Sequence, residues 1–403
     1  IETVNGSTDC NAYNDTTLLE NLVTPLNGVY TLGGVSPDFT SFSELATVLN
    51  NAGQTGPVTV NVRDGVYNEE FYISDIIGNS FNNSLTIKGE SGDSSLVILS
   101  GSNSTTDLLM QITSVKKLEL RHLTFSQNGN AWSGSDAYTF MDCDSLLIVN
   151  CSFQDNTIYP YQYASRLRVD GGQGVLIQEN NFLEKASIRI YPNSTNSSCD
   201  FIITGNINLI DIGVEKGSSQ SGSSLKTLIT RNQINSRVYC DYYYGSSDTL
   251  IIENNEIILT QTAYMTYGSG TDGFMVLRNN NIRSNGSGSA QRFQLHNVDS
   301  IIGNRFTNFS NSEYGILQIS KESSKTTTVA NNYFQFGGLL ANRGIYLGNS
   351  QDNGLLIIAH NSFESLSSTS SHNIYVTNDQ QLLVKNNIFS AKNGGVLLNV
   401  SNP

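Results

Sequence analysis

The chain has 403 residues, of which only 14% are charged, and a formal net charge of −13. Because nucleic acids and the inner leaflets of membranes are anionic, this balance and the lack of any basic run exclude both as favoured partners. No apolar run is long enough for a membrane-spanning helix, so we expect no membrane insertion. The abundant Ser, Thr, Asn and Gly indicate a β-rich surface solvated by hydroxyls and amides.

The amino-terminal 55 residues form the first predicted unit, an irregular segment followed by a capping helix. Ser41-Phe-Ser-Glu44 has the pattern of a capping box and predicts a helix over 41–51 that ends before Gly53. One face of this helix is apolar, and we expect it to cover the open end of whatever follows. Residues 56–403 show no linker or change of composition, so we predict a single continuous second domain.

A repeated sequence frame with a period of about 26 residues fills this second domain. An apolar residue precedes a central Asn by three positions, and an aromatic residue or Ile usually follows it by two. The central residues are Asn180, Asn206, Asn232, Asn255, Asn280, Asn304, Asn332, Asn361 and Asn387. Upstream the frame continues without Asn, with Leu123 and then Cys151 at the central position.

This period, with short strand-like runs and almost no helical patterning, predicts an all-β fold, a single-stranded right-handed parallel β-helix of about a dozen coils. Asn tolerates the left-handed backbone region, so we expect each ladder Asn in a tight turn. A buried amide both donates and accepts, which would let the column hydrogen-bond along the stack. The aromatic or Ile side chains should point inward and stack in a second column.

The five cysteines show no CxxC or Cys/His spacing, which argues against a zinc site. Cys151 occupies the Asn column, where a buried thiol would pack as a small hydrophobic group. Alternatively, Cys143 with Cys151, or Cys10 with a later cysteine, would pair in an oxidising compartment. The sequence leaves both interpretations open.

The opening of the chain carries a family resemblance. The segments Gly28-Val-Tyr-Thr-Leu-Gly-Gly, Gly56-Pro-Val-Thr-Val-Asn-Val-Arg-Asp-Gly-Val-Tyr67 and Leu85-Thr-Ile-Lys-Gly-Glu90 resemble the start of pectate-lyase-like β-helix proteins. Within that superfamily they look like the surface proteins that Bacteroidetes export by type IX secretion. The resemblance implies a secreted or cell-surface location, further domains of a longer chain, and contact with polysaccharide or another surface.

The same opening is similar to pectin methylesterases, whose active site includes an Asp-Phe-Ile-Phe-Gly strand motif and a partner Asp. The nearest match is Asp200-Phe-Ile-Ile-Thr-Gly205, which departs at the fourth and fifth positions. Asp170 is the best available partner. We therefore name Asp170 and Asp200 as catalytic candidates, and favour the alternative that Asp200 is a turn carboxylate before a buried strand.

The densest acidic cluster consists of Asp136, Asp142 and Asp144. Carboxylates are the ligands that Ca²⁺ prefers, so these residues are candidates for a calcium site. The sequence suggests no cofactor other than Ca²⁺. No EF-hand or nonapeptide calcium repeat is present, and we favour dispersed turn carboxylates.

Tyrosines recur about seven to twelve residues after the ladder position of several neighbouring coils, with arginines in the same coils. Similar offsets place residues on one side of a solenoid, and aromatic rings beside Arg and Asp suit stacking on sugar rings. The alternative is that the tyrosines point inward or are ordinary strand formers. The candidate ligand-binding residues are Tyr159, Tyr161, Tyr163, Tyr191, Tyr239, Tyr242, Tyr244, Tyr264, Tyr267, Arg168, Arg189 and Arg237.

Three functions remain open on this evidence. A non-catalytic, adhesin-like module that binds polysaccharide needs only a rigid rod and a receptive face, and we favour it. A polysaccharide lyase or carbohydrate esterase needs a compact catalytic cluster, which the sequence does not present. A purely structural stalk predicts that the tyrosine-rich side binds nothing.

Overall fold

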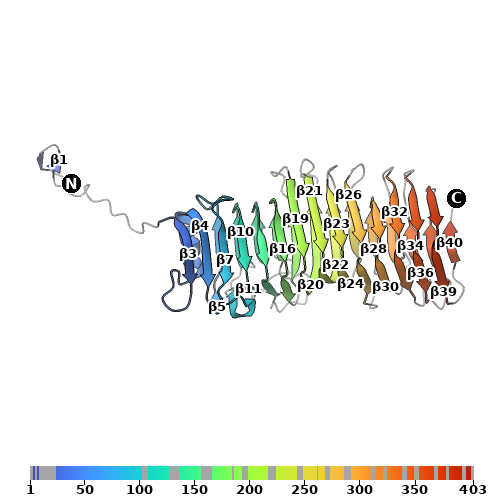
Figure 1. Cartoon of the computed structure of the whole chain (residues 1–403), viewed down its shortest axis with the longest axis horizontal. Helices are drawn as coiled ribbons and strands as arrows, with labels where there is room; N and C mark the ends of the chain where they lie inside the picture. Colours follow the sequence, from blue (N-terminus) through green and yellow to red (C-terminus); the bar gives the residue numbers. More distant parts are fainter. Residues whose placement is uncertain are drawn as a thin grey trace.

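The computed structural model describes residues 3–4, 7–8, 24–101, 108–127, 136–155, 166–183, 186–192, 198–216, 224–242, 248–260, 262–267, 273–285, 292–309, 315–320, 325–337, 343–348, 354–366, 371–377, 381–392 and 396–400. From residue 24 onward they form a rod in which short strands lie across the long axis (Figure 1). The rod is a right-handed parallel β-solenoid of about ten turns, which confirms the predicted fold class. Within the described residues, no helix is long and apolar enough to span a membrane.

The first face of the solenoid is a sheet of 14 parallel strands. Its strands are β3 (Leu26–Leu32), β4 (Gln54–Val62), β7 (Leu85–Gly89), β10 (Leu118–Arg121), β13 (Leu147–Val149), β16 (Val175–Gln178), β19 (Ser198–Thr204), β21 (Ser224–Thr230), β23 (Thr249–Glu253), β26 (Phe274–Arg278), β29 (Ser300–Ile302), β32 (Thr327–Ala330), β35 (Leu356–Ala359) and β38 (Leu382–Lys385). Because β3 pairs with β4, the sheet includes a strand from the segment that we predicted to be the amino-terminal cap.

The second face follows the ladder position of each turn. It consists of β5 (Gly65–Asn68), β8 (Val97–Ser100), β11 (Thr124–Gln127), β14 (Ser152–Asp155), β17 (Asn181–Leu183), β24 (Glu256–Leu259), β27 (Asn281–Ser284), β30 (Arg305–Phe309), β33 (Tyr333–Phe336), β36 (Ser362–Ser365) and β39 (Ile388–Ala391). A short 3-10 helix, η1 (Ser94–Leu96), precedes β8, and an antiparallel pair, β1 (Thr3–Val4) with β2 (Ser7–Thr8), lies near the amino terminus.

The third face completes each turn. Its strands are β6 (Phe71–Ser74), β9 (Met110–Thr113), β12 (Tyr138–Met141), β15 (Arg166–Asp170), β18 (Ser187–Tyr191), β20 (Leu209–Lys216), β22 (Gln233–Tyr242), β25 (Ala263–Tyr267), β28 (Phe293–His296), β31 (Leu317–Ser320), β34 (Arg343–Leu347), β37 (His372–Val376) and β40 (Val396–Val400). β20 and β22 are long enough to begin on the second face and continue around the corner, with a register shift in their pairing after Leu209.

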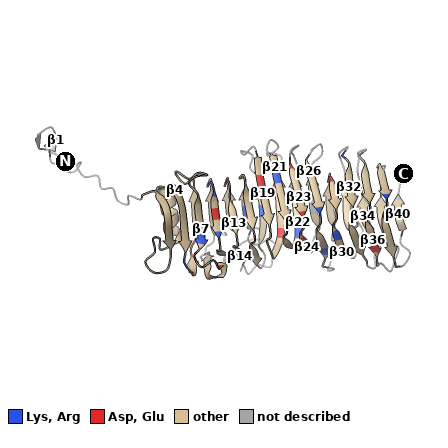
Figure 2. Ribbon diagram, viewed as in Figure 1, with Lys and Arg blue, Asp and Glu red and all other residues tan. Residues whose placement is uncertain are grey.

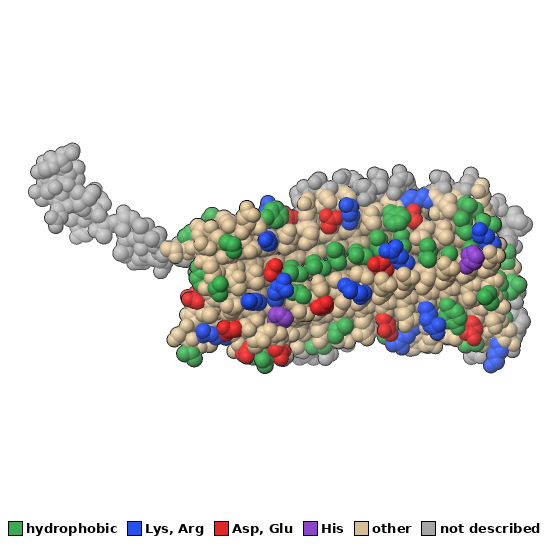
Figure 3. All heavy atoms as spheres, in the orientation of Figure 1, with side chains coloured by type: hydrophobic (Ala, Val, Ile, Leu, Met, Phe, Trp, Pro, Cys, Tyr) green, Lys and Arg blue, Asp and Glu red, His purple; other side chains and the backbone are tan. Residues whose placement is uncertain are grey.

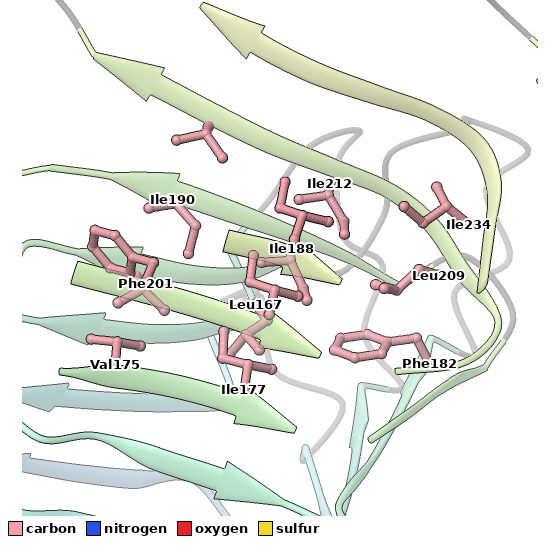
Figure 4. Close-up of a cluster of buried hydrophobic side chains, with 14 of the residues drawn as sticks. Leu167, Val175, Ile177, Phe182, Ile188, Ile190, Phe201, Leu209, Ile212 and Ile234 are labelled. Carbon is pink, nitrogen blue, oxygen red and sulfur yellow. The ribbon is translucent and has the colours of Figure 1, made fainter. Parts of the chain in front are cut away.

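The interior is filled by apolar side chains in columns that run along the rod. Strand pairing on the first face aligns Val60, Ile87, Leu120, Ile148, Ile177, Ile203, Ile229, Ile252, Leu277, Ile301, Val329, Ile358 and Val384. Figure 4 shows side chains of all three faces meeting inside one part of the rod, such as Ile177, Phe182 and Ile188. Since residues alternate in and out along a strand, the residues between these positions form the outer surface.

The Asn ladder forms as predicted. The side-chain oxygen of Asn206 accepts hydrogen bonds from the backbone nitrogen and the Nδ2 of Asn180, both at 3.0 Å. Asn206 Nδ2 in turn donates to Oδ1 of Asn232 and to the Ile177 carbonyl. The same pattern repeats up to Asn387, and eight of the nine side chains are buried, the half-buried Asn387 being the exception. Each ladder Asn therefore supplies the hydrogen-bond acceptor that the buried backbone nitrogen of the ladder residue one turn earlier requires.

The left-handed residue of each turn is not the ladder Asn, as we had expected, but the residue immediately before it. All nine such residues have positive φ angles: Glu179, Gly205, Arg231, Asn254, Asn279, Gly303, Asn331, His360 and Asn386. The ladder Asn keeps ordinary backbone geometry because its role is to hydrogen-bond the neighbouring rungs. The expectation was wrong because Asn-Asn pairs occur at four of these turns, which hid the division of roles between the two positions.

Aromatic side chains two residues after the ladder position stack inside the rod, as predicted. Ring centroids of Phe306, Phe334 and Phe363 lie 4.9 Å apart in succession, with nearly parallel planes. A second stack joins Phe125, Phe153 and Phe182 at 5.3 and 5.0 Å. The spacing matches the distance between neighbouring strands, so each ring packs on its equivalent one turn away.

The capping helix, α1 (Phe42–Asn51), confirms the prediction. Its N-cap Ser41 accepts a hydrogen bond from the Glu44 backbone nitrogen, and Phe42, Leu45, Ala46 and Leu49 are buried. The Glu69 carboxylate accepts from the backbone nitrogens of Phe42 and Ser43 at 2.9 Å, which satisfies two further donors at the helix amino terminus. The Phe42 ring packs edge-on against Tyr67 and Phe71, so the helix closes the amino-terminal end of the core.

Cys143 and Cys151 are buried free thiols, which decides between the two interpretations left open for them and excludes their pairing. Cys151 instead takes the first place in the ladder column, where its backbone nitrogen donates to Asn180 Oδ1 at 2.9 Å. Burial raises the pKa of each thiol to about 12, which keeps both protonated and unreactive at neutral pH. Cys10 lies outside the described residues.

Candidate functional site

One row of residues runs along the third face in continuous strand register. Most of its described side chains are half-buried or exposed, whereas Thr139, Arg189 and Gly213 are buried. It contains Tyr72, Gln111, Thr139, Arg168, Arg189, Gly213, Tyr239, Tyr264, Gln294, Gln318, Tyr346, Tyr375 and Asn399. We call these thirteen residues the polar–aromatic row. Tyr, Arg and amide side chains occupy eleven of the thirteen positions, and none of the thirteen is aliphatic or acidic.

Arg168 is held in one orientation by two carboxylates. Its Nε and NH2 donate to the two oxygens of Asp170 at 2.8 and 2.7 Å, and its NH1 donates to Asp136 at 2.7 Å. The hydrogen bond to Asp170 is the main reason that the pKa of Arg168 is raised. The guanidinium carbon also lies 4.6 Å from the centre of the Tyr191 ring, a cation–π arrangement. Arg168 therefore presents a fixed, planar and charge-compensated group.

Arg189, one rung further, is buried. Its NH1 and NH2 donate to the two oxygens of Asp211 at 3.1 Å, and Asp211 also accepts from Arg237 Nε at 3.3 Å. Burial by itself would lower the pKa of Arg189, but Asp211 outweighs it and the pKa is raised. A Cβ on Gly213 would lie only 2.4 Å from Arg189 NH1, so the glycine in the row leaves the space that the guanidinium fills.

The carboxyl-terminal part of the row is aromatic. The Tyr346 and Tyr375 rings stack with centroids 5.8 Å apart, and Arg343 lies over both, 5.2 and 3.9 Å from their centres. His372 meets Tyr375 edge-on, and its Nε2 is 2.9 Å from Asn399 Nδ2. Since the amide nitrogen donates, Nε2 accepts and the imidazole proton is on Nδ1.

Acid should weaken this end of the rod through His372. Burial, with the neighbouring Arg343 charge, holds the pKa of His372 below its usual 6.5. The unfolded chain therefore binds a proton that the folded chain resists, so the free energy of unfolding should fall as the pH drops below about 6.5. We expect His372→Gln to lose less stability between pH 7 and pH 5 than the wild type in urea titrations followed by circular dichroism. Equal losses would contradict this assignment.

The structure places some of the predicted ligand-binding residues together. Arg168, Arg189, Tyr239 and Tyr264 share the row, and Tyr242 and Tyr267 are register partners three residues further along the same two strands. Tyr191 and Arg237 flank the row through their contacts with Arg168 and Asp211. Tyr159, Tyr161, Tyr163 and Tyr244 lie outside the described residues.

The two catalytic candidates are not brought together. Asp170 ends β15 on the third face, whereas Asp200 lies in β19 on the first face, paired in register with Lys226. Asp170 is also occupied by Arg168. The esterase motif that they were drawn from is therefore not assembled by these two residues.

The acidic cluster does not form a calcium site in the described part of the chain, where no group of three His, Cys, Asp or Glu side chains is arranged to hold a metal ion. Asp136 binds Arg168, and Asp144 accepts from the Gln173 backbone nitrogen at 3.0 Å. Asp142 and Ser145 both have left-handed backbone angles, as expected of turn residues. Close spacing in sequence was misleading because β12 separates Asp136 from Asp142 and Asp144, and because Asp136 and Asp144 are engaged by other groups.

Sequence reasoning missed the carboxyl-terminal half of the row. Gln294, Gln318, Tyr346 and Tyr375 each lie 14 residues after a ladder Asn (Asn280, Asn304, Asn332 and Asn361). This constant offset was a usable signal, but it lies beyond the window of about seven to twelve residues in which we counted tyrosines.

Comparison with known proteins identifies neither a family nor a function for the chain. No model of a protein family matches the chain. No curated protein shows significant sequence similarity to it. The candidate site therefore rests on the geometry of the polar–aromatic row.

Proposed function

We propose that this chain is a β-helix module, secreted or displayed at a cell surface, that binds polysaccharide along the polar–aromatic row without cleaving it. The observation that carries the proposal is the continuous register of Tyr, Arg and amide residues along one face. Aromatic faces stack on the apolar faces of sugar rings, and guanidinium and amide groups hydrogen-bond to hydroxyls.

The rigidity of the row supports this role. The half-buried Arg168 is held by two hydrogen bonds to one carboxylate, so little side-chain entropy is lost when a ligand binds. Arg189, held in the same way by Asp211, is buried and stiffens the face from beneath. Because these charges are already compensated, this half of the row favours sugar hydroxyls over anionic groups. Figure 2 shows how sparse the charged residues are along the whole rod, and Figure 3 shows them dispersed over the visible face, several of them beside a residue of opposite charge.

A location outside the cell is supported by the resemblance of the chain's opening to exported surface proteins of the pectate-lyase-like superfamily, including those of the type IX pathway. A catalytic role has less support. Of its two candidate carboxylates, Asp170 is engaged by Arg168 and Asp200 belongs to another face.

Tyr239→Ala tests the proposal. Tyr239 is half-buried in the row with Arg237 5.6 Å from its ring centre, and its removal should weaken binding to the polysaccharide that the wild type retains best by about tenfold. Affinity electrophoresis in gels containing single neutral or acidic polysaccharides, with and without Ca²⁺, measures the change.

The matched control is Tyr333→Ala, which removes a half-buried tyrosine of the second face, also beneath an arginine. We expect its retardation to equal that of the wild type. If both variants or neither lose retardation, the row is not the binding surface. If no polysaccharide retards the wild type, the chain is better explained as a stalk.

A further inference from the structure

Arg343 differs from Arg168, Arg189 and Arg237, whose side chains are described on other strands of the third face, in having no carboxylate partner. Arg168, Arg189 and Arg237 are all ion-paired with Asp side chains, at 2.7 to 3.3 Å. Among the residues that the structure describes, no Asp or Glu forms an ion pair with Arg343, and its Nε has no hydrogen-bond partner. Its main contacts are the two stacked tyrosine rings beneath it.

Two residues on the strands next to β34 also have unused hydrogen-bonding atoms. His372, the register partner of Arg343, has a buried Nδ1 without a partner, and Gln318, the register partner of Tyr346, has an unpartnered Oε1. Polar groups left unpaired are unfavourable for stability, so this cluster is not explained by the demands of the fold. Gln318 belongs to the polar–aromatic row, and Arg343 and His372 lie beside the carboxyl-terminal end of the row.

The tyrosines give the unpaired cation a defined position. Stacking on Tyr375 at 3.9 Å fixes the plane of the guanidinium and leaves its edge to donate. A planar guanidinium recognises a carboxylate or sulfate with two parallel hydrogen bonds. The net charge of −13 repels anions at long range. Selectivity for an anion must therefore come from direct contact with the Arg343 guanidinium.

We propose that Arg343, stacked on Tyr346 and Tyr375, is an anion-recognising subsite that takes the carboxylate or sulfate ester of a sugar residue. The inference rests on the proposed function and makes it more specific: the bound polysaccharide carries acidic groups that reach Arg343, whereas the part of the row around Arg168 contacts uncharged hydroxyls. The Tyr346 and Tyr375 rings supply the apolar platform for the same sugar.

The test uses glucuronate, glucose 6-sulfate and glucose as probes, titrated into the full chain and followed by saturation-transfer NMR. We expect both anionic sugars to bind more tightly than glucose, and Arg343→Gln to weaken them by about tenfold to a hundredfold without changing glucose binding. Arg343→Lys, which keeps the charge but loses the planar fork, should restore only part of the affinity.

Arg305→Gln is the matched control. Arg305 also lies over a tyrosine, 4.7 Å from the Tyr333 ring centre, but on the second face, where Glu364 is close enough to be affected by its charge. The control removes the same charge and should leave binding of both anionic sugars unchanged. A preference for only one of the two anionic sugars would identify the source of the anion and still support the subsite.

Three results would overturn the subsite. They are equal affinity for glucose and the anionic sugars, equal losses in Arg343→Gln and Arg305→Gln, and inorganic sulfate binding as tightly as glucose 6-sulfate, which would show an ion site that does not recognise sugar. The first two leave the proposed function intact if polysaccharide retardation still depends on Tyr239. Loss of that dependence would overturn the proposed function separately.

Discussion

Asn255→Ala should lower the free energy of unfolding by about 3–5 kcal/mol, since it removes several buried hydrogen bonds at once. Asn255 Oδ1 accepts from the backbone nitrogen and Nδ2 of Asn232, and its Nδ2 donates to Asn280 Oδ1 and the Ile229 carbonyl. Alanine would leave the Asn232 backbone nitrogen buried without its acceptor, and would remove one donor from both the Ile229 carbonyl and Asn280 Oδ1. Urea denaturation followed by circular dichroism measures the change.

Asn387→Ala is the control for this loss, because the same residue type there is half-buried at the last rung of the ladder. We expect less than half the effect. In a solenoid each turn contacts only its neighbours, so the Asn255 variant should also broaden the transition. Equal effects at the two positions would show that the ladder is not a main source of stability.

Asp248→Asn should destabilise the fold by about 3–5 kcal/mol, because it removes the carboxylate from a fully buried ion pair. Both oxygens of Asp248 lie 2.8 Å from Lys216 Nζ, and one also accepts from the Leu225 backbone nitrogen at 2.8 Å. Burial raises the pKa of Asp248, although Lys216 opposes this, which indicates how strongly the site is desolvated. Urea denaturation of the purified variant measures the loss.

A double variant, Lys216→Met with Asp248→Leu, separates the cost of an unpaired charge from the value of the pair. Replacing both charges with apolar groups of similar size should recover most of the stability lost in Asp248→Asn. Glu256→Gln is the exposed control, since its ion pair with Arg283 is half-exposed on both sides, and it should cost less than about 1 kcal/mol. A double variant no more stable than Asp248→Asn would contradict this interpretation.

The repeat predicted the core of this fold because one position per turn has one structural role. The ladder and the inward aromatic stacks depend on residues close to the repeat frame, such as Asn304 and Phe306, whose register the repeat fixes directly. The capping helix was predictable from a separate local signal, the capping box that begins at Ser41. The division between the left-handed residue and the ladder Asn was missed, because both positions accept Asn and only backbone angles distinguish them.

The candidate site was less predictable because the turns differ in length between the ladder and the third face. Tyr239 is seven residues after Asn232 and Tyr264 is nine after Asn255, yet the two are register partners. Long strands that continue around the corner, such as β22, absorb the difference. Ion pairs such as Arg189 with Asp211 join different turns, so their partners cannot be read from local spacing.

Size-exclusion chromatography of polysaccharides mixed with the purified chain tests the central claim most directly. The polar–aromatic row predicts that at least one polysaccharide elutes together with the wild-type protein at its original length, and that Tyr239→Ala reduces this co-elution. Separate elution of protein and polysaccharide throughout a panel of neutral and acidic chains would contradict binding. Shortened polysaccharide would contradict the non-catalytic role.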